Sequence, residues 1–126
     1  MEINHKIRDS HFPDCPVRNV IARISDRWSI LIFLTLELAK KPMRFTEIEH
    51  AIPDISQKML TRTLRDLEAD GFVIRKAYAE VPPRVEYELT ERAHSLTPLL
   101  NDLVEWASSH LEGIVNNRKK YYKKQK

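Results

Sequence analysis

SQKMLTRTLRDLEADG, residues 56–71, is predicted to form the helix around which the rest of the chain is arranged. Ser56 is a residue type that caps helix N-termini, and Asp70-Gly71 supplies a helix stop. Between them, apolar residues recur at the i, i+4, i+7 spacing of one helix face: Leu60, Leu64 and Leu67. The stretch therefore predicts an amphipathic helix that packs one face against a core.

The opposite face of this helix carries side chains that donate hydrogen bonds to base edges and phosphates when a helix lies in a DNA major groove. These residues are Gln57, Lys58, Thr61, Arg62 and Arg65. A solvated helix surface shows the same pattern, because charged residues at helical spacing are common there. The neighbouring segments decide between the two interpretations.

The segments on both sides predict a winged helix-turn-helix. Thr46-x-x-Glu49 has the capping-box pattern of a short helix that reaches about Ile52, and Pro53-Asp54 ends it just before Ser56. After Gly71 the apolar period changes from 3.6 to 2, which predicts strands over 72–79 and 84–89. The loop 80–83 between them contains two prolines, so the two strands form a hairpin, the wing.

Three further helices are predicted outside this unit: 17–24, 27–40, and a long one that begins at Thr90-Glu91. The helix 27–40 is apolar around most of its circumference and should be buried on more than one side. Pro98 predicts a kink or break near 95–97 in the last helix. The apolar stripes of the first and last helices exceed the needs of one small domain, so pairing with a second copy would bury them.

The composition is that of one globular domain of 126 residues, with one cysteine. Six of the 21 basic residues and none of the 18 acidic ones lie in 118–126, so residues 1–117 carry a net charge of −3. Any argument for nucleic-acid binding must therefore rest on local patches. We expect a mobile arm at 1–14, the winged domain with its flanking helices at 15–112, and a basic, solvated tail at 113–126.

No apolar run is long enough to cross a bilayer, and the first residues, MEINHKIRDSHF, lack the apolar core of a signal peptide. These features predict a cytoplasmic protein without membrane contact. The single thiol excludes an internal disulfide and fits a reducing compartment.

Seven ordered motifs resemble the HxlR-type winged helix-turn-helix regulators, relatives of the MarR group. They are Cys15-Pro16, Asp26-Arg27-Trp28, RFTEI at 44–48, IPDISQKML at 52–60, LRDLEADG at 64–71, PRVEYELT at 83–90, and Trp106. The resemblance covers about 15–106. It implies an α+β, mainly α fold and a homodimer that binds double-stranded DNA at a pseudo-palindromic operator, without a cofactor.

By position, the resemblance assigns DNA contacts to Ser56, Gln57, Lys58, Thr61 and Arg62. It assigns Arg65 to phosphate and Arg84 of the wing to the minor groove; an ion pair of Arg84 with Glu86 or Glu80 is the alternative. The implied dimer interface lies on the N- and C-terminal helices, at Val17, Val20, Ile21, Leu99, Leu103 and Trp106. Lys40-Lys41-Pro42 and Ala93 stand where such proteins commonly have glycine, which affects loop geometry and not the DNA-facing residues.

Cys15 is the candidate thiol sensor. A helix N-terminus stabilises the nucleophilic thiolate, although the adjacent Asp14 opposes it. Some members of the family sense electrophiles or oxidants through a cysteine at this position, and a small-molecule effector is the other candidate switch. The alternative is a small buried hydrophobic side chain or an inert capping residue.

No enzyme is predicted, because the chain shows no Ser/His/Asp set, no paired carboxylates with a reason to be buried, and no phosphate loop. His11 and Cys15 alone are a weak metal signal, so no metal site is predicted. Two other functions stay open at this point: a winged-helix module that binds an acidic protein, and a small-molecule binder that uses the dimer interface.

Overall fold

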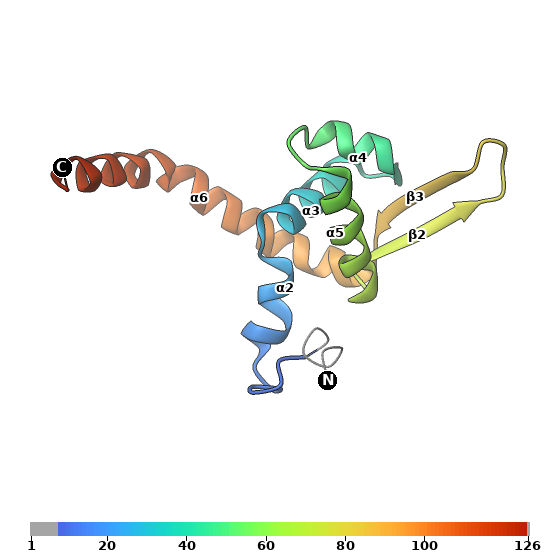
Figure 1. Cartoon of the computed structure of the whole chain (residues 1–126), viewed down its shortest axis with the longest axis horizontal. Helices are drawn as coiled ribbons and strands as arrows, with labels where there is room; N and C mark the ends of the chain where they lie inside the picture. Colours follow the sequence, from blue (N-terminus) through green and yellow to red (C-terminus); the bar gives the residue numbers. More distant parts are fainter. Residues whose placement is uncertain (1–7, 126) are drawn as a thin grey trace.

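The computed structural model describes residues 8–125, in which a small antiparallel sheet extends as a hairpin from one side of a group of helices (Figure 1). Residues 1–7, half of the predicted N-terminal arm, and residue 126 lie outside the described residues. In chain order the elements are η1 Val17–Ile21, α2 Ala22–Ile24, α3 Arg27–Ala39, β1 Met43–Arg44, α4 Phe45–Ala51, α5 Gln57–Ala69, β2 Val73–Tyr78, β3 Arg84–Leu89 and α6 Glu91–Lys124.

The core lies where α3 packs against α4, α5, β3 and the first turns of α6. Its fully buried side chains come from these elements: Ile32, Phe33, Ile48, Leu60, Leu64 and Leu67. The predicted apolar face of α5 is thus confirmed. Helix α3 is buried on more than one side, as predicted, since it contacts α4, α5, α6 and β3. Leu38 is an exception among its apolar residues, because it is 84% exposed.

Short polar side chains fix the starts of three helices, among them the cap predicted at Ser56. The Asp26 carboxylate accepts hydrogen bonds from the backbone of Trp28 and Ser29 at the start of α3. Ser56 Oγ accepts from Met59 N–H at 3.1 Å, and Thr90 Oγ1 accepts from Ala93 N–H at 3.3 Å. These contacts satisfy N–H groups that have no partner inside the helix.

Helix α4 begins earlier than the Thr46-x-x-Glu49 pattern predicted. Phe45 is its first residue, and the carboxylate of Glu47, not of Glu49, reaches back to accept from the Arg44 backbone N–H at 2.8 Å. The helix ends at Ala51, and residues 52–56 form the turn that leads into α5. Together α4 and α5 are the predicted helix-turn-helix.

The wing is the hairpin of β2 and β3, paired from Val73↔Leu89 to Tyr78↔Arg84. A third strand, β1, pairs with the base of β3 through Met43↔Tyr87. The sheet order is β1-β3-β2. Sequence patterns did not predict β1 as a strand, because two residues are too short for a detectable period.

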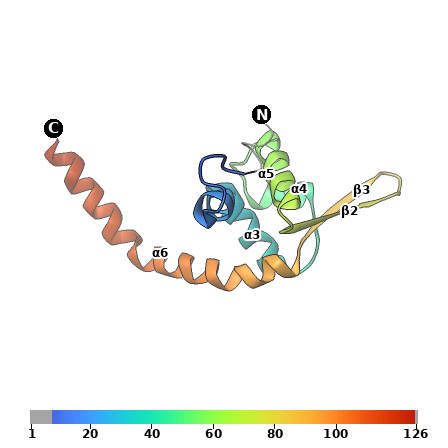
Figure 2. The same ribbon diagram turned by 90° about the horizontal axis from the view of Figure 1, so that it is seen from below.

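A kink or break was predicted near 95–97; helix α6 runs from Glu91 to Lys124 without interruption, so there is no break. Pro98 has no N–H for the carbonyl of His94, and the hydroxyl of Thr97 donates to that carbonyl instead, at 3.1 Å. Figure 2 shows that the helix changes direction near its middle. The basic residues expected in a frayed tail continue this helix up to Lys124.

The N-terminal helix predicted at 17–24 consists of a π-helical turn, η1, followed by the short α2. Arg23 ties it to the end of α5, because its Nε donates to Asp70 Oδ2 at 2.6 Å and this contact raises the pKa of Arg23. None of the helices within residues 8–125 is long and apolar enough to span a membrane.

Candidate nucleic-acid interface

One face of α5 presents polar side chains to solvent. Lys58, Thr61, Arg62 and Arg65 are exposed on it, together with Gln57 in the first turn. None of these five side chains forms a hydrogen bond or an ion pair with another residue of 8–125. Because Leu60, Leu64 and Leu67 hold the opposite face in the core, the helix offers these donors to a partner in a fixed orientation.

Ser56 differs from the other predicted recognition residues, since its hydroxyl oxygen caps α5. Ser56 therefore has the N-cap role that its residue type predicted. The hydroxyl hydrogen of Ser56 remains able to donate to a phosphate.

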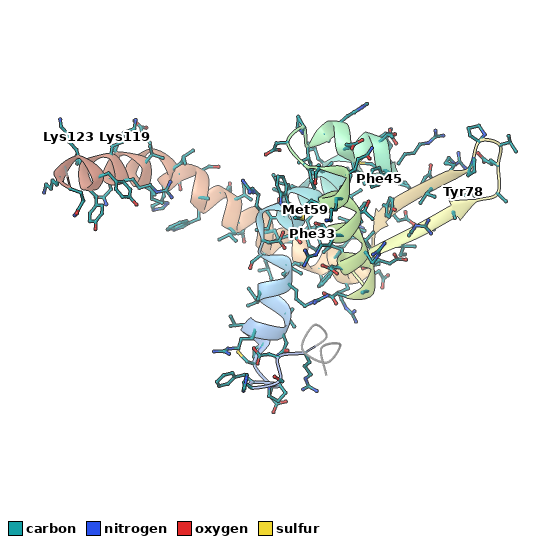
Figure 3. The ribbon with its side chains drawn as sticks, in the orientation of Figure 1. Phe33, Phe45, Met59, Tyr78, Lys119 and Lys123 are labelled. Carbon is teal, nitrogen blue, oxygen red and sulfur yellow. The ribbon has the colours of Figure 1, made fainter. Side chains whose placement is uncertain are left out.

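The cations of one face of the wing are already paired with carboxylates. Lys76 Nζ lies 2.8 Å from Glu88 Oε1, and this hydrogen bond raises the pKa of Lys76. Arg84 Nη2 lies 3.1 Å from Glu80 Oε1, and its guanidinium stacks 4.2 Å from the ring centre of Tyr78, which Figure 3 labels on the wing. The structure thus shows the ion pair that was the alternative to a free Arg84.

A shallow hollow of about 370 Å³ lies between α5 and the wing. Its lining residues come from both elements: Thr61, Leu64, Arg65, Glu68, Arg75 and Tyr87. The sequence patterns assign no DNA contact to Arg75, which lies on β2. Its position in this hollow depends on the pairing of β2 with β3, which no local pattern reports.

Cys15 lies just before η1, is partly buried, and is a free thiol. Asn19 organises the backbone around it by donating to the carbonyls of Cys15 at 2.8 Å and Phe12 at 3.0 Å. Asp9 accepts hydrogen bonds from the His11 and Phe12 backbones, and these lower its pKa. Residues 8–19 therefore form a hydrogen-bonded cap over the start of the helix.

The residues predicted for a dimer interface are all exposed apolar side chains in the single chain. They are Val17, Val20 and Ile21 in the N-terminal helix and Leu99, Leu103 and Trp106 in α6. Trp106 stacks on His110 with ring centres 4.2 Å apart. An exposed apolar surface of this kind marks a site of contact with another molecule.

In residues 8–125 no three His, Cys, Asp or Glu side chains lie close enough to hold a metal ion. The weak pair of His11 and Cys15 gains no third ligand there.

A three-helix core, a helix-turn-helix and a β-hairpin wing beside the free face of the second helix define a winged helix-turn-helix protein of the DNA-binding class. The sequence pattern of the HxlR-like helix-turn-helix family matches residues 23–115, and the chain belongs to this family of transcriptional regulators.

Two relatives illustrate the similarity. An uncharacterized HTH-type transcriptional regulator of Methanothermobacter thermautotrophicus is 47% identical over 96 residues, which is 76% of this chain and 72% of the relative. The uncharacterized HTH-type regulator YybR of Bacillus subtilis is 40% identical over 104 residues, 82% of each chain.

Among solved structures, the redox regulator HypR is similar in both of its forms. Its reduced form gives a TM-score of 0.73 at 37% identity and covers 81% of this chain and 99% of its own. Its oxidised form gives a TM-score of 0.68 at 41% identity and covers 75% of this chain and 96% of its own.

Proposed function

We propose that this protein is a homodimeric transcriptional regulator that binds a specific, pseudo-palindromic operator in double-stranded DNA. The observation that carries the proposal is the fixed, unpaired polar face of α5 beside the wing. Such a face supplies both base and phosphate donors when the helix lies in a major groove. In this proposal the protein acts in the cytoplasm.

The homodimer is supported by the exposed apolar residues of η1 and α6. Leu103 and Trp106 are 53% and 55% exposed on one stripe of α6, and η1 adds Val17 and Val20. A two-fold axis between two such surfaces would place the two α5 helices about 34 Å apart, one turn of DNA.

Regulation through Cys15 or a small molecule completes the proposal. The similarity to a redox regulator solved in two oxidation states supports the thiol, and so does the position of Cys15 in a capped segment next to the proposed interface. An oxidant such as a peroxide would take two electrons and two protons from two Cys15 thiols to form a disulfide. That bond would shift the dimer away from the DNA-compatible arrangement.

The test is selection of bound duplexes from a random pool at two salt concentrations, with Cys15 reduced and then oxidised. We expect an inverted repeat that is released on oxidation. A repeat that is bound equally in both states would retain the regulator and remove the thiol switch. Failure to enrich any sequence would contradict DNA recognition and favour a protein-binding module.

Arg62→Ala tests base reading within this proposal. We expect a loss of about 1–3 kcal/mol on the selected operator, with relaxed base preference at one position. Titration of the operator and of a scrambled duplex measures this effect. An equal loss on both duplexes would assign Arg62 to phosphate.

A further inference from the structure

We propose that Arg75 of the wing and Arg65 of α5 together bind one phosphate of the DNA backbone in the hollow between these elements. This inference rests on the proposed function and deepens it, because it adds a contact from a residue outside the recognition helix. It also makes Arg75, and not Arg84, the cation that the wing offers to DNA.

The strand register places Arg75 on the face of the wing that turns toward the core. Arg75 pairs with Tyr87, and two residues along each strand Val73 pairs with Leu89. Cross-strand partners and residues two apart share one face of a sheet. The face is buried at three positions: Val73, Tyr87 and Leu89. It is therefore the face packed against the body of the protein. Arg75 lies on the same face but is exposed, beside α5.

The opposite face of the hairpin holds cations that are already neutralised. Lys76 is 2.8 Å from Glu88, while Arg84 is 3.1 Å from Glu80 and 3.9 Å from Glu86. Binding a DNA phosphate through either residue would first require breaking these contacts. The charge of the wing that is free for an anion is therefore on the α5 side.

Arg75 and Arg65 are exposed and make no hydrogen bond or ion pair with any other residue in the described part of the chain. Both line the hollow of about 370 Å³, and Thr61 adds a hydroxyl. Glu68 also lines it, which leaves the site with one net positive charge. Two guanidinium groups, each able to donate two parallel hydrogen bonds, suit a phosphate that carries one negative charge.

The position of the hollow identifies the phosphate as part of a duplex. It is lined by Thr61 and Arg65 of the free face of α5 and by the pair Arg75 and Tyr87 of the hairpin, so a DNA strand that bounds the groove occupied by α5 would pass over it. A contact of this kind fixes how deeply α5 enters the groove and carries no base preference of its own.

The experiment measures the affinity of the dimer for its selected operator and for a scrambled duplex across a range of salt concentrations. We expect Arg75→Ala and Arg75→Gln to weaken binding roughly tenfold on both duplexes and to reduce the salt slope by about one. Lys76→Ala is the matched control on the same strand, since Lys76 is engaged by Glu88, and it should stay within about twofold of the native affinity.

The pairing of the two arginines is tested by combining their substitutions. Arg65→Ala should weaken binding like Arg75→Ala, and the double variant should lose less than the sum, because both residues hold one phosphate. Arg75→Lys should keep the salt slope and lose part of the affinity, since it retains the charge without the two parallel donors. Circular dichroism and the melting temperature verify that each variant is folded.

Native affinity and salt slope in both folded Arg75 variants would overturn the inference and leave the proposed function intact. Binding of inorganic phosphate that is lost in Arg75→Ala while DNA binding is unchanged would overturn it too, by assigning the site to a free anion. If the native protein binds no duplex, the proposed function itself fails, and this result is separate from either outcome for Arg75.

Discussion

At the scale of single residues, the two glycines of the chain occupy opposite backbone environments. Gly71 has φ +82°, and a Cβ added to it would lie 2.5 Å from Nη1 of Arg92, whose guanidinium donates to the Asp70 carbonyl. Gly113 lies within α6 with open space around it. The end of α5 therefore requires glycine, and α6 does not.

We predict that Gly71→Ala lowers the free energy of unfolding by about 1–2 kcal/mol, since alanine is strained at positive φ and displaces Arg92. Gly113→Ala is the control and should raise it by about 0.5–1 kcal/mol through helix propensity. Urea denaturation measures both values. Equal effects at the two positions would contradict the backbone explanation.

Lys76 provides a prediction for the dependence on pH. The hydrogen bond with Glu88 raises the pKa of Lys76 in the folded protein above its ordinary value. Because the folded pKa is the higher one, the contribution of this pair to stability is complete below the unfolded pKa and disappears as the pH rises through the folded pKa. NMR titration of the lysine side chain should show the raised pKa, and Glu88→Gln should return it to the ordinary range. An unchanged pKa in Glu88→Gln would show that the pair does not form in solution.

At the scale of elements, α6 shows how a helix accommodates a proline. Thr97 is buried at 3% exposure, and its hydroxyl replaces the N–H that Pro98 cannot offer to the His94 carbonyl. A proline inside a helix otherwise leaves this acceptor without a partner. The sequence predicted a kink or break at this position, because the apolar period holds no information about a hydrogen bond from a side chain to the backbone.

We predict that Thr97→Val lowers the free energy of unfolding by about 1–2 kcal/mol, since valine keeps the shape and removes the donor. In the background of Pro98→Ala, where the backbone N–H is restored, the same change should cost distinctly less. Thermal or urea unfolding of the four proteins forms a double-mutant cycle. An identical cost in both backgrounds would show that Thr97 acts through packing alone.

At the scale of the whole molecule, α6 leads away from the body on the side opposite the wing (Figures 1 and 2). Within residues 8–125 its apolar side chains Leu99, Leu103 and Trp106 remain exposed. Beyond these side chains the same helix carries exposed basic residues, among them Lys119 and Lys123, which Figure 3 labels near its far end. A single copy therefore exposes both the proposed dimer surface and a basic arm.

We predict that Leu103→Glu dissociates the proposed homodimer, because it places a charge within an apolar contact. Leu38→Glu is the matched control, as Leu38 is also an exposed leucine but lies on α3, outside the predicted interface. Sedimentation velocity should show a monomer for the first variant and a dimer for the second. A dimer that persists in Leu103→Glu would exclude this face of α6 from the interface.

The sequence alone determined the class of protein and most of the backbone elements, with β1 as an exception. Helix caps at Asp26, Ser56 and Thr90, the leucine period of α5 and the alternation of β3 are local patterns, and local sterics and hydrogen bonds set backbone conformation. The same local patterns also predicted the polar face of α5. Their limits appear at α4, where the Thr46-x-x-Glu49 pattern placed the helix start two residues later than the structure does.

Only the tertiary structure decided which of the candidate DNA-binding side chains are free of ion pairs within residues 8–125. Arg84 is held by Glu80 and Glu86, whereas Arg75 is unpaired among residues 8–125 and shares a hollow with Arg65. Leu38 faces solvent and Thr97 lies in the core. These properties depend on cross-strand register and on contacts between segments far apart in the chain, and the period of a single segment carries no information about either.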